Sequence, residues 1–452
     1  MAVELFAGAA GFPSAFAALL AGTRERSVDV EATVRAILQD VRERGDAAVR
    51  EYTRRFDHID LAVVGSCISI AERDACAAAA PAAAVAALEF AAARIHAFHQ
   101  RQQPAGFSMT DEAGVRLEQR WTPLQSVGLY VPGGTAAYPS SVLMNALPAR
   151  VAGVPRVVMV VPTPEGRITP LVCAAARLAG VEEIYRIGGA QGIAALAYGT
   201  TTIAPVDKIV GPGNAYVAAA KRQVFGQVGI DMIAGPSEIV VVADGPGNDP
   251  DWIAADLMSQ AEHDTAAQAI LITDDPVFAR AVIAAVERLL SCLPRADIAG
   301  ASWRDHGAVI VVERLEDAVP LVNALAPEHL ELAVLEPDSL AAGVRHAGAI
   351  FLGRHTPEAV GDYVGGPNHV LPTARSARFS SGLSVFDFLK RTSLLSCDAG
   401  ALARIGPAAM ILAEAEGLTA HAHAVAVRLN KNWNQGGMGE AVPPPCLVQN
   451  KP

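Results

Sequence analysis

Residues 259–264, which read SQAEHD, carry side chains that could bind a metal ion. They end a run, residues 252–258, whose composition predicts a helix. Residues three apart on a helix lie on one face, so Gln260 and His263 would point the same way. Imidazole suits zinc and its neighbours, and harder oxygen ligands can complete the shell. The alternative, from these six residues alone, is a polar helix end with a solvated histidine.

A second cluster pairs an acid with an imidazole. Glu328 and His329 are adjacent at the start of a predicted strand. Consecutive strand residues face opposite sides of a sheet, but at the end of a strand both can border one cleft. Histidine titrates near neutrality and is the commonest general base. The pair is therefore a candidate acid/base couple.

Two more segments add metal-binding side chains. The glycine-rich segment 361–369 contains Asp362 and His369. Glu416 and His421 lie five residues apart, on different faces of an ideal helix, so they converge only if Gly417 interrupts the helix. Each cluster taken singly could be structural. Taken together they offer a candidate ligand set of Gln260, His263, Asp362 and His421, with Glu328 and His329 as acid and base.

Three glycine-rich turns follow predicted strands, at residues 132–135 (PGGT), 188–192 (GGAQG) and 211–214 (GPGN). In an open parallel sheet such turns gather at the carboxyl edge, where ligands bind. Glycine lets the backbone approach a phosphate, and the following helix N-terminus favours an anion. None is a G-x-G-x-x-G fingerprint. The turns favour a nucleotide or phosphate site slightly over plain strand–helix connections.

Hydrophobic periodicity places these clusters on an α/β scaffold. Helices are predicted over residues 28–56, with an interruption at 45–46, and over 71–102, with a break at Pro81; a hairpin is predicted over 107–121. A first strand–helix series has strands at 127–131, 156–161, 183–187, 208–210 and 238–243. A second series has strands at 269–273, 308–312, 329–334 and 349–352, and the pattern after residue 392 is helical. Alternating strands and helices predict parallel sheets.

The predicted organisation has five parts. They are N-terminal helices and a hairpin packing on the sheet domains (1–126), a first sheet domain (127–236), a second sheet domain (237–382), a helical C-terminal segment (383–430) and a disordered tail (431–452). Residues 7–20 are apolar, but no positive residue precedes them, so they are interpreted as a helix rather than a signal peptide.

Composition excludes several classes of protein. The chain has 452 residues, of which 51% are hydrophobic, and a net charge of −11 without a basic stripe, so nucleic acid is not an expected partner. No apolar run reaches the length of a membrane span. The six cysteines form no C-x-x-C pair, which favours reduced thiols in the cytoplasm.

From about Val28 to Leu429 the chain resembles the histidinol dehydrogenase family. The resemblance is carried by nine ordered blocks, including RIGGAQGIAALAYGT, VDKIVGPGNAYV, DLMSQAEHD, APEHLEL and AVGDYVGGPNHVLPT. It implies an α/β fold of two Rossmann-like parallel-sheet domains of similar architecture plus a small helical C-terminal domain. It also implies zinc-dependent oxidation of L-histidinol through L-histidinal to L-histidine with two NAD⁺, in the last oxidation of histidine biosynthesis. The family binds one Zn²⁺ per active site and forms a homodimer with intertwined subunits.

The resemblance also implies a role for each matched residue. His329 would be the general base and Glu328 would activate water. Glu416 and His421 would reach the neighbouring subunit's site. The implied zinc ligands are Gln260, His263, Asp362 and His421; the implied substrate contacts are these four with Ser237, His329, His369 and Glu416; the implied NAD⁺ contacts are Tyr130, Gln191 and Asn214.

Three alternatives stay open at this stage. Some relatives oxidise other hydroxylated substrates, such as sulfonated propanediols, but they tend to lose the residues matching Glu328, His369 and Glu416. A zinc hydrolase could use a metal-bound water with Glu328 as base, yet it would not need the three glycine turns. A non-catalytic binding protein would be expected to lack His329 or part of the metal-ligand set.

Overall fold

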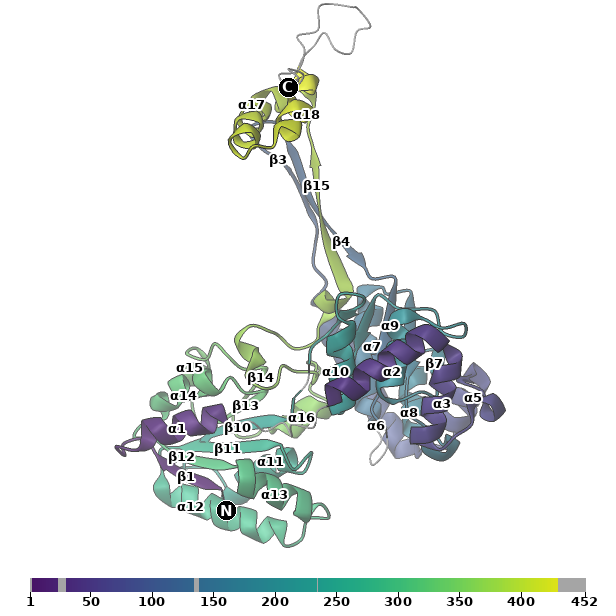
Figure 1. The fold of residues 1–452 in the computed structure, drawn as a ribbon. Coiled ribbons are helices and arrows are strands. Elements are labelled where there is room, and N and C mark those ends of the chain that lie inside the picture. The colour runs from purple at the N-terminus through teal and green to yellow at the C-terminus, as the bar shows by residue number, and fades with distance from the viewer. Residues whose placement is uncertain (1, 23–29, 134–137, 234, 430–452) are drawn as a thin grey trace, which may run out of the picture. The chain divides into compact units, whose positions relative to one another are not determined.

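The computed structural model describes residues 2–22, 30–133, 138–233 and 235–429 (Figure 1). The chain divides into two compact units. The first combines Met1–Gln103 with Pro123–Leu389 and holds both parallel sheets. The second combines Pro104–Thr122 with the chain from Lys390 onward.

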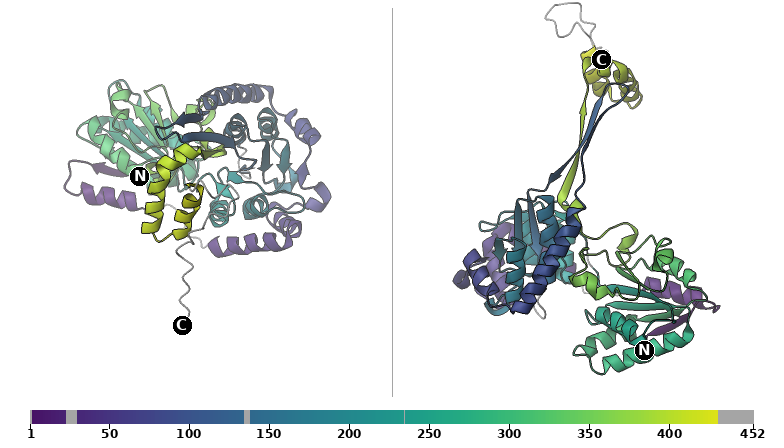
Figure 2. Two further views of the ribbon diagram at one scale, coloured as in Figure 1. Left: turned by 90° about the horizontal axis from the view of Figure 1, so that it is seen from above. Right: turned by 180° about the vertical axis from the view of Figure 1, so that it is seen from behind.

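The first parallel sheet has helices on both faces (Figure 2). Its strands, in spatial order, are β2 (Cys67–Ile68), β7 (Glu183–Tyr185), β6 (Arg156–Val160), β5 (Ser126–Tyr130), β8 (Lys208–Val210) and β9 (Gly229–Ile230). All neighbours pair in parallel except β2, which is antiparallel at one edge. The connecting helices are α7 (Pro139–Ala152), α8 (Pro170–Leu178), α9 (Gly189–Tyr198) and α10 (Ala215–Val224).

The strand order reverses between β5 and β8, because β6 and β7 lie on one side of β5 and β8 and β9 lie on the other. The carboxyl ends of the strands on either side of such a reversal form the usual ligand crevice of an open parallel sheet. Residues 132–133 after β5 and the turns after β7 and β8 therefore lie at one edge, as the sequence predicts.

The second sheet is parallel throughout. Its order is β1 (Val3–Phe6), β12 (Ala308–Val311), β11 (Gln268–Thr273), β10 (Glu238–Ala243), β13 (His329–Ala333) and β14 (Ala349–Leu352). Helices α11 (Pro250–Ala261), α12 (Pro276–Leu290) and α13 (Ala296–His306) cover one face, and α1 (Phe12–Ala21), α14 (Ala318–Leu325) and α15 (Pro337–Ala341) cover the other.

Two features of this sheet differ from the sequence pattern. Residues 238–243, counted as the last strand of the first series, form the central strand β10 of the second sheet. Residues 3–6 form the edge strand β1, for which no strand is predicted. β10 is apolar at every position after Glu238, and β1 has only four residues. Periodicity within such a strand does not reveal which distant strand it pairs with. The predicted boundary at 236/237 does place β10 with the second sheet.

The predicted N-terminal helices are confirmed with their interruptions. Residues 28–56 form α2 (Val30–Arg44) and α3 (Asp46–Asp57), separated by Gly45, whose φ of +55° favours glycine. Residues 71–102 form α5 (Ile70–Ala77) and α6 (Ala82–Gln100), separated at Pro81. A short helix, α4 (Leu61–Val64), lies between the two pairs.

The second unit contains a strand that the sequence analysis assigns to a helical segment. The predicted hairpin is confirmed as β3 (Phe107–Thr110) and β4 (Arg116–Pro123). The segment 383–430 is not wholly helical, because β15 (Leu389–Ser396) pairs with β4 in a three-stranded sheet. Two helices follow, α17 (Ala399–Ala415) and α18 (Thr419–Leu429). The predicted tail, 431–452, lies outside the described residues.

Among the described residues, no single helix has the length and apolar composition of a membrane span. Only the bent pair α5 and α6 meets that test jointly, across a 116° break.

We predict that Gly211→Ala destabilises the first sheet far more than Gly226→Ala. Both glycines have positive φ, +111° and +98°, so each alanine pays about 1–2 kcal/mol for the left-handed side of the backbone map. A Cβ at Gly211 would also lie 2.2 Å from the carbonyl oxygen of Tyr130, whereas one at Gly226 meets nothing within 4 Å. Thermal melting followed by circular dichroism should place Gly211→Ala several degrees below Gly226→Ala. Equal melting temperatures would contradict the close approach.

Candidate active site

The amino ends of β10 and β13 hold the acid–imidazole pair. Glu328 and His329 are buried, 7% and 3% exposed. The Nδ1 atom of His329 lies 3.0 Å from the carbonyl oxygen of Glu238, and a Glu328 carboxylate oxygen accepts the Glu238 N–H at 2.9 Å. His329 Nδ1 lies 3.7 Å from Glu328 Oε2, so the start of the strand does bring both side chains together.

The contact with the Glu238 carbonyl sets the chemistry of the imidazole. A carbonyl oxygen only accepts, so Nδ1 donates to it and carries the proton of the neutral ring. The other nitrogen, Nε2, is buried without a hydrogen-bond partner. Burial lowers the pKa of His329 below its ordinary value, which keeps the ring neutral at pH 7. Nε2 therefore carries a lone pair that is free to accept a proton.

Helix α16 (Glu358–Tyr363) places two carboxylates against that nitrogen. Glu358 Oε1 lies 3.6 Å and Asp362 Oδ1 3.7 Å from His329 Nε2. One ligand atom from each of these three residues lies within 4.8 Å of the others. A Cβ at Gly361 would lie 2.3 Å from the ring of Phe351, so glycine permits α16 to pack this closely on β14.

Glu358 is a site residue that is not among those predicted from the sequence. Its signal is the spacing Glu358–Asp362, because residues four apart on a helix share a face. Burial and the charge of Asp362 raise the pKa of the Glu358 carboxyl to about 9. Burial also raises the pKa of Glu328 well above its ordinary value. Packed acids of this kind are costly to ionise together, and a divalent cation beside them would offset that cost.

Helix α11 carries Gln260 and lies beside α16. Gln260 is 1% exposed, and its Oε1 has no hydrogen-bond partner. The hydroxyl of the preceding Ser259 lies 3.3 Å from Glu358 Oε2. His263 lies just past the end of the helix, in a turn closed by its N–H to the Gln260 carbonyl, and its side chain is exposed. A buried amide oxygen without a donor is what an oxygen ligand to a cation looks like in the absence of the ion.

Two predicted substrate contacts border this cluster. His369 Nδ1 lies 2.8 Å from the backbone carbonyl oxygen of Asp362 and 3.9 Å from its carboxylate. Ser237 directly precedes β10, and its carbonyl accepts the N–H of Gln268 at 2.9 Å. The structure thus groups His369 with Asp362 and places Ser237 at the same strand end as Glu238.

Glu416 and His421 belong to the second unit. Glu416 ends α17, Gly417 follows with φ of +73°, and His421 lies in the first turn of α18. The predicted interruption at Gly417 is therefore confirmed. Both side chains are exposed. Their contribution to the site stays a prediction.

The carboxyl edge of the first sheet holds the predicted nucleotide contacts. Gln191, in the first turn of α9, is 1% exposed, and neither polar atom of its amide has a partner. The hydroxyl of Tyr130 accepts the N–H of Gly189 at 3.0 Å, and burial raises its pKa to about 12. Asn214 caps α10 by accepting from the N–H groups of Tyr216 and Val217. The unpaired amide fits a polar ligand; Thr135 lies outside the described residues.

A buried ion pair fixes the third of these turns. Lys221 and Asp231 pair at 3% and 1% side-chain exposure. Lys221 Nζ donates to the carbonyl of Gly211 at 2.9 Å, and Asp231 Oδ2 accepts the N–H of the same glycine at 2.8 Å. The two charged side chains thus bind both backbone polar groups of Gly211. Sequence reasoning does not find this pair, because its members are ten residues apart on separate elements.

The polar helical setting of His99 is typical of a surface residue, but His99 is fully buried, with Nδ1 2.8 Å from the Ile95 carbonyl oxygen and the amide of Asn368 near its other nitrogen. The reason is tertiary: α6 packs against α7, which its local sequence does not show.

Comparison with known proteins agrees with this geometry. The family described as "Histidinol dehydrogenase" matches residues 21–429. The chain is 67% identical to a histidinol dehydrogenase of Rhodospirillum rubrum, covering 96% of this chain and all of that protein. It is 65% identical to one of Rhizobium meliloti, covering 95% and 99%.

A solved structure agrees over nearly the whole chain. The histidinol dehydrogenase of Elizabethkingia anophelis superposes with a TM-score of 0.90 at 36% identity, covering 95% of this chain and 98% of that one. The described residues thus share both the sequence of those relatives and the two-sheet α/β architecture of that structure. This chain belongs to the histidinol dehydrogenase family.

Proposed function

We propose that this protein oxidises L-histidinol through L-histidinal to L-histidine and reduces two NAD⁺, as the last oxidation of histidine biosynthesis. The observation that carries the proposal is the buried Nε2 of His329, a neutral and unpartnered base facing Glu358 and Asp362. Membership of the family supplies the reaction for which such a base is suited.

In the first step, His329 would accept the alcohol proton at Nε2, and NAD⁺, when bound, would supply the acceptor for the hydride of the carbinol carbon. The Glu238 carbonyl keeps the ring in the required tautomer. In the second step, Glu328 would take a proton from the water that attacks the aldehyde, and a second NAD⁺, when bound, would supply the acceptor for the hydride of the hydrated aldehyde. The raised pKa of Glu328 makes it a stronger base once ionised.

The residues present fit one zinc ion per site. Gln260 Oε1 is buried without a donor, His263 offers an imidazole, and Asp362 offers a carboxylate. The fourth ligand would be His421 of the partner subunit. When bound, the zinc would anchor the substrate's amine and imidazole. Ser237, His369 and Glu416 would hold the rest of the substrate.

The NAD⁺ contacts are assigned to the first sheet. Gln191 would use its unpaired amide. Asn214 would use its amide nitrogen, because its amide oxygen caps the helix. Tyr130 supports the Gly188–Gly189 turn and would contact the cofactor through that edge.

A homodimer with intertwined subunits is proposed from the second unit. Its helices bury little within the chain: Ala401 and Gly406 in α17, and Ala422 in α18. Large apolar side chains stay exposed there, with Leu395 at 68%, Ile411 at 67% and Leu412 at 64%. A second copy would cover them. We place the enzyme in the cytoplasm, with no nucleic-acid or membrane partner.

The reaction predicts two NADH per histidinol consumed. Absorbance in the NADH band, with limiting histidinol and excess NAD⁺, measures this ratio directly. Prolonged chelation should abolish turnover, and added Zn²⁺ should restore it. One NADH per substrate, or full activity after verified metal removal, would contradict the proposal.

His329→Asn should lower kcat by about 10²–10⁴-fold, the usual contribution of a general base. The KM for histidinol should change little, because the ligands and holding residues remain. His355→Asn is the matched control, since His355 is exposed beside Trp252 and is not part of the site. Lost substrate binding with unchanged kcat would show that the role is misassigned.

Mixing two inactive variants tests the shared site. His263→Asn and His421→Asn each spoil both sites of their own homodimer. A mixed dimer carries one site with both histidines intact, so subunits exchanged at random should recover about a quarter of wild-type activity. No recovery, with mixed dimers verified by mass spectrometry, would place both histidines in one chain's site.

A further inference from the structure

Glu238 contacts both proposed catalytic residues. Its backbone N–H donates to the Glu328 carboxylate at 2.9 Å, and its carbonyl oxygen lies 3.0 Å from His329 Nδ1. Its own carboxylate accepts the N–H of Glu328 at 3.3 Å. One residue of β10 therefore meets the acid through both its backbone and its side chain, and meets the base through its carbonyl.

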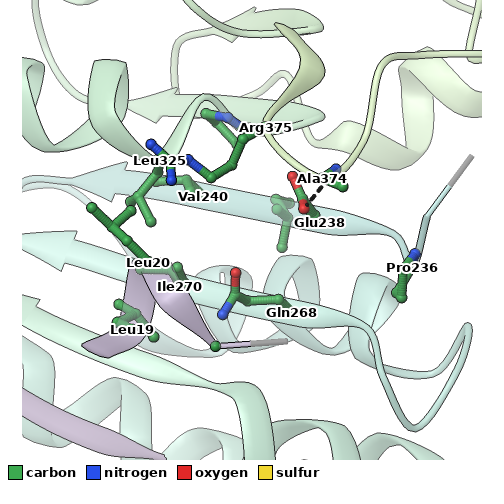
Figure 3. A pocket seen from close by; sticks show the side chains of 13 residues that line it. Leu19, Leu20, Pro236, Glu238, Val240, Gln268, Ile270, Leu325, Ala374 and Arg375 are labelled. Atoms are coloured by element: carbon green, nitrogen blue, oxygen red, sulfur yellow. Dashed lines mark hydrogen bonds between the residues drawn. The ribbon is translucent and has the colours of Figure 1, made fainter. Parts of the chain in front are cut away.

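The carboxylate of Glu238 lies on the face of the sheet opposite to His329. In the parallel register Ile239 lies opposite His329, so these two side chains share a face of the sheet. Side chains alternate along a strand, so Glu238 points to the other face, together with Val240. There it borders a cavity of about 220 Å³, lined also by Gln268, Arg375 and the end of α1 (Figure 3). The carboxylate is thus separated by the sheet from the face on which His329 meets Asp362.

The same carboxylate secures a strained turn. Its second oxygen accepts the N–H of Ala374 at 3.0 Å (Figure 3). Ala374 and Arg375 both have positive φ, +51° and +62°, a conformation that residues with a Cβ adopt only when their surroundings enforce it. Arg375 is tied in turn to the Ala324 carbonyl through Nε. The turn is therefore connected to Glu238 by a hydrogen bond that its side chain accepts.

We propose that Glu238 is a positioning residue, whose carboxylate bridges the residue before β13 and the 373–376 turn and so holds Glu328 and His329 in catalytic alignment. The proposal rests on the proposed function. It assigns Glu238 no contact with substrate or cofactor. Its effect should appear in the rate of chemistry rather than in binding, because a misplacement of about 1 Å at a catalytic group can cost about 10²-fold in rate.

Two substitutions of Glu238 should lower kcat to different extents. Glu238→Gln keeps the shape but leaves one acceptor oxygen for two N–H groups, so kcat should fall about tenfold. Glu238→Ala removes both bonds, so kcat should fall about 10²-fold. In both, KM for histidinol and NAD⁺ and the affinity for the product L-histidine should stay within about twofold of wild type. The cavity already beside the carboxylate means that truncation enlarges an open space instead of breaking a packed core.

Gln268→Ala is the matched control. Gln268 lines the same cavity from the neighbouring strand, and its side chain donates to the His306 carbonyl and not to either proposed catalytic residue. Its kcat should match wild type. The measurements are steady-state kinetics, calorimetric binding of L-histidine and thermal melting of the intact zinc-loaded enzyme.

The outcomes separate clearly. The proposal is supported if kcat is lowest in Glu238→Ala, intermediate in Glu238→Gln and highest in the wild type, while ligand binding and melting temperature are retained. Unchanged kcat in Glu238→Ala, an equal loss in Gln268→Ala, or a loss of kcat that follows a lowered melting temperature in Glu238→Gln would overturn it. Failure of the proposed function would show separately, as wild-type enzyme without histidinol-dependent NADH formation.

Discussion

The pairing of β10 with β13 is the constraint on which the site depends. It puts the backbone of Glu238 beside Glu328 and His329, so the peptide groups of one strand fix the tautomer of the imidazole and one oxygen of the acid. Backbone groups in a sheet have little freedom to move, so this alignment exists before any ligand binds. Both residues therefore lie at a buried strand end.

Desolvation explains why the cluster around this pair suits a cation and a substrate. Gln260 Oε1, His329 Nε2 and Glu358 Oε1 are buried without hydrogen-bond partners. An unpaired buried polar atom costs free energy, which folding tolerates where a ligand later supplies the missing contact. The unpaired amide of Gln191 at the edge of the first sheet fits the same interpretation for the cofactor. The second sheet would thus bind the substrate, and the first sheet would bind the nucleotide.

The sequence predicted what local chemistry determines. The helix carrying Gln260, the strand beginning at His329 and the break at Gly417 follow from periodicity and glycine placement. The elements it missed are set by distant partners. Strands β1 and β15 are fixed by pairing with β12 and β4, and the burial of His99 is fixed by packing between helices. Glu238 is not evident from the sequence because its partners, Glu328 and Ala374, lie far along the chain. For Glu358 the four-residue spacing to Asp362 is a local signal, but its contact with His329 is not.

We propose that a cation is held beside His329 by Gln260, His263 and Asp362 together with His421 of the partner subunit. Anomalous diffraction at the zinc edge, from crystals of the zinc-loaded enzyme, tests this ligand set most directly. We expect one anomalous peak per site within bonding distance of those four side chains, with His329 outside the ligand shell. A peak bonded instead to His329 and Glu358, or no peak near Gln260, would contradict it.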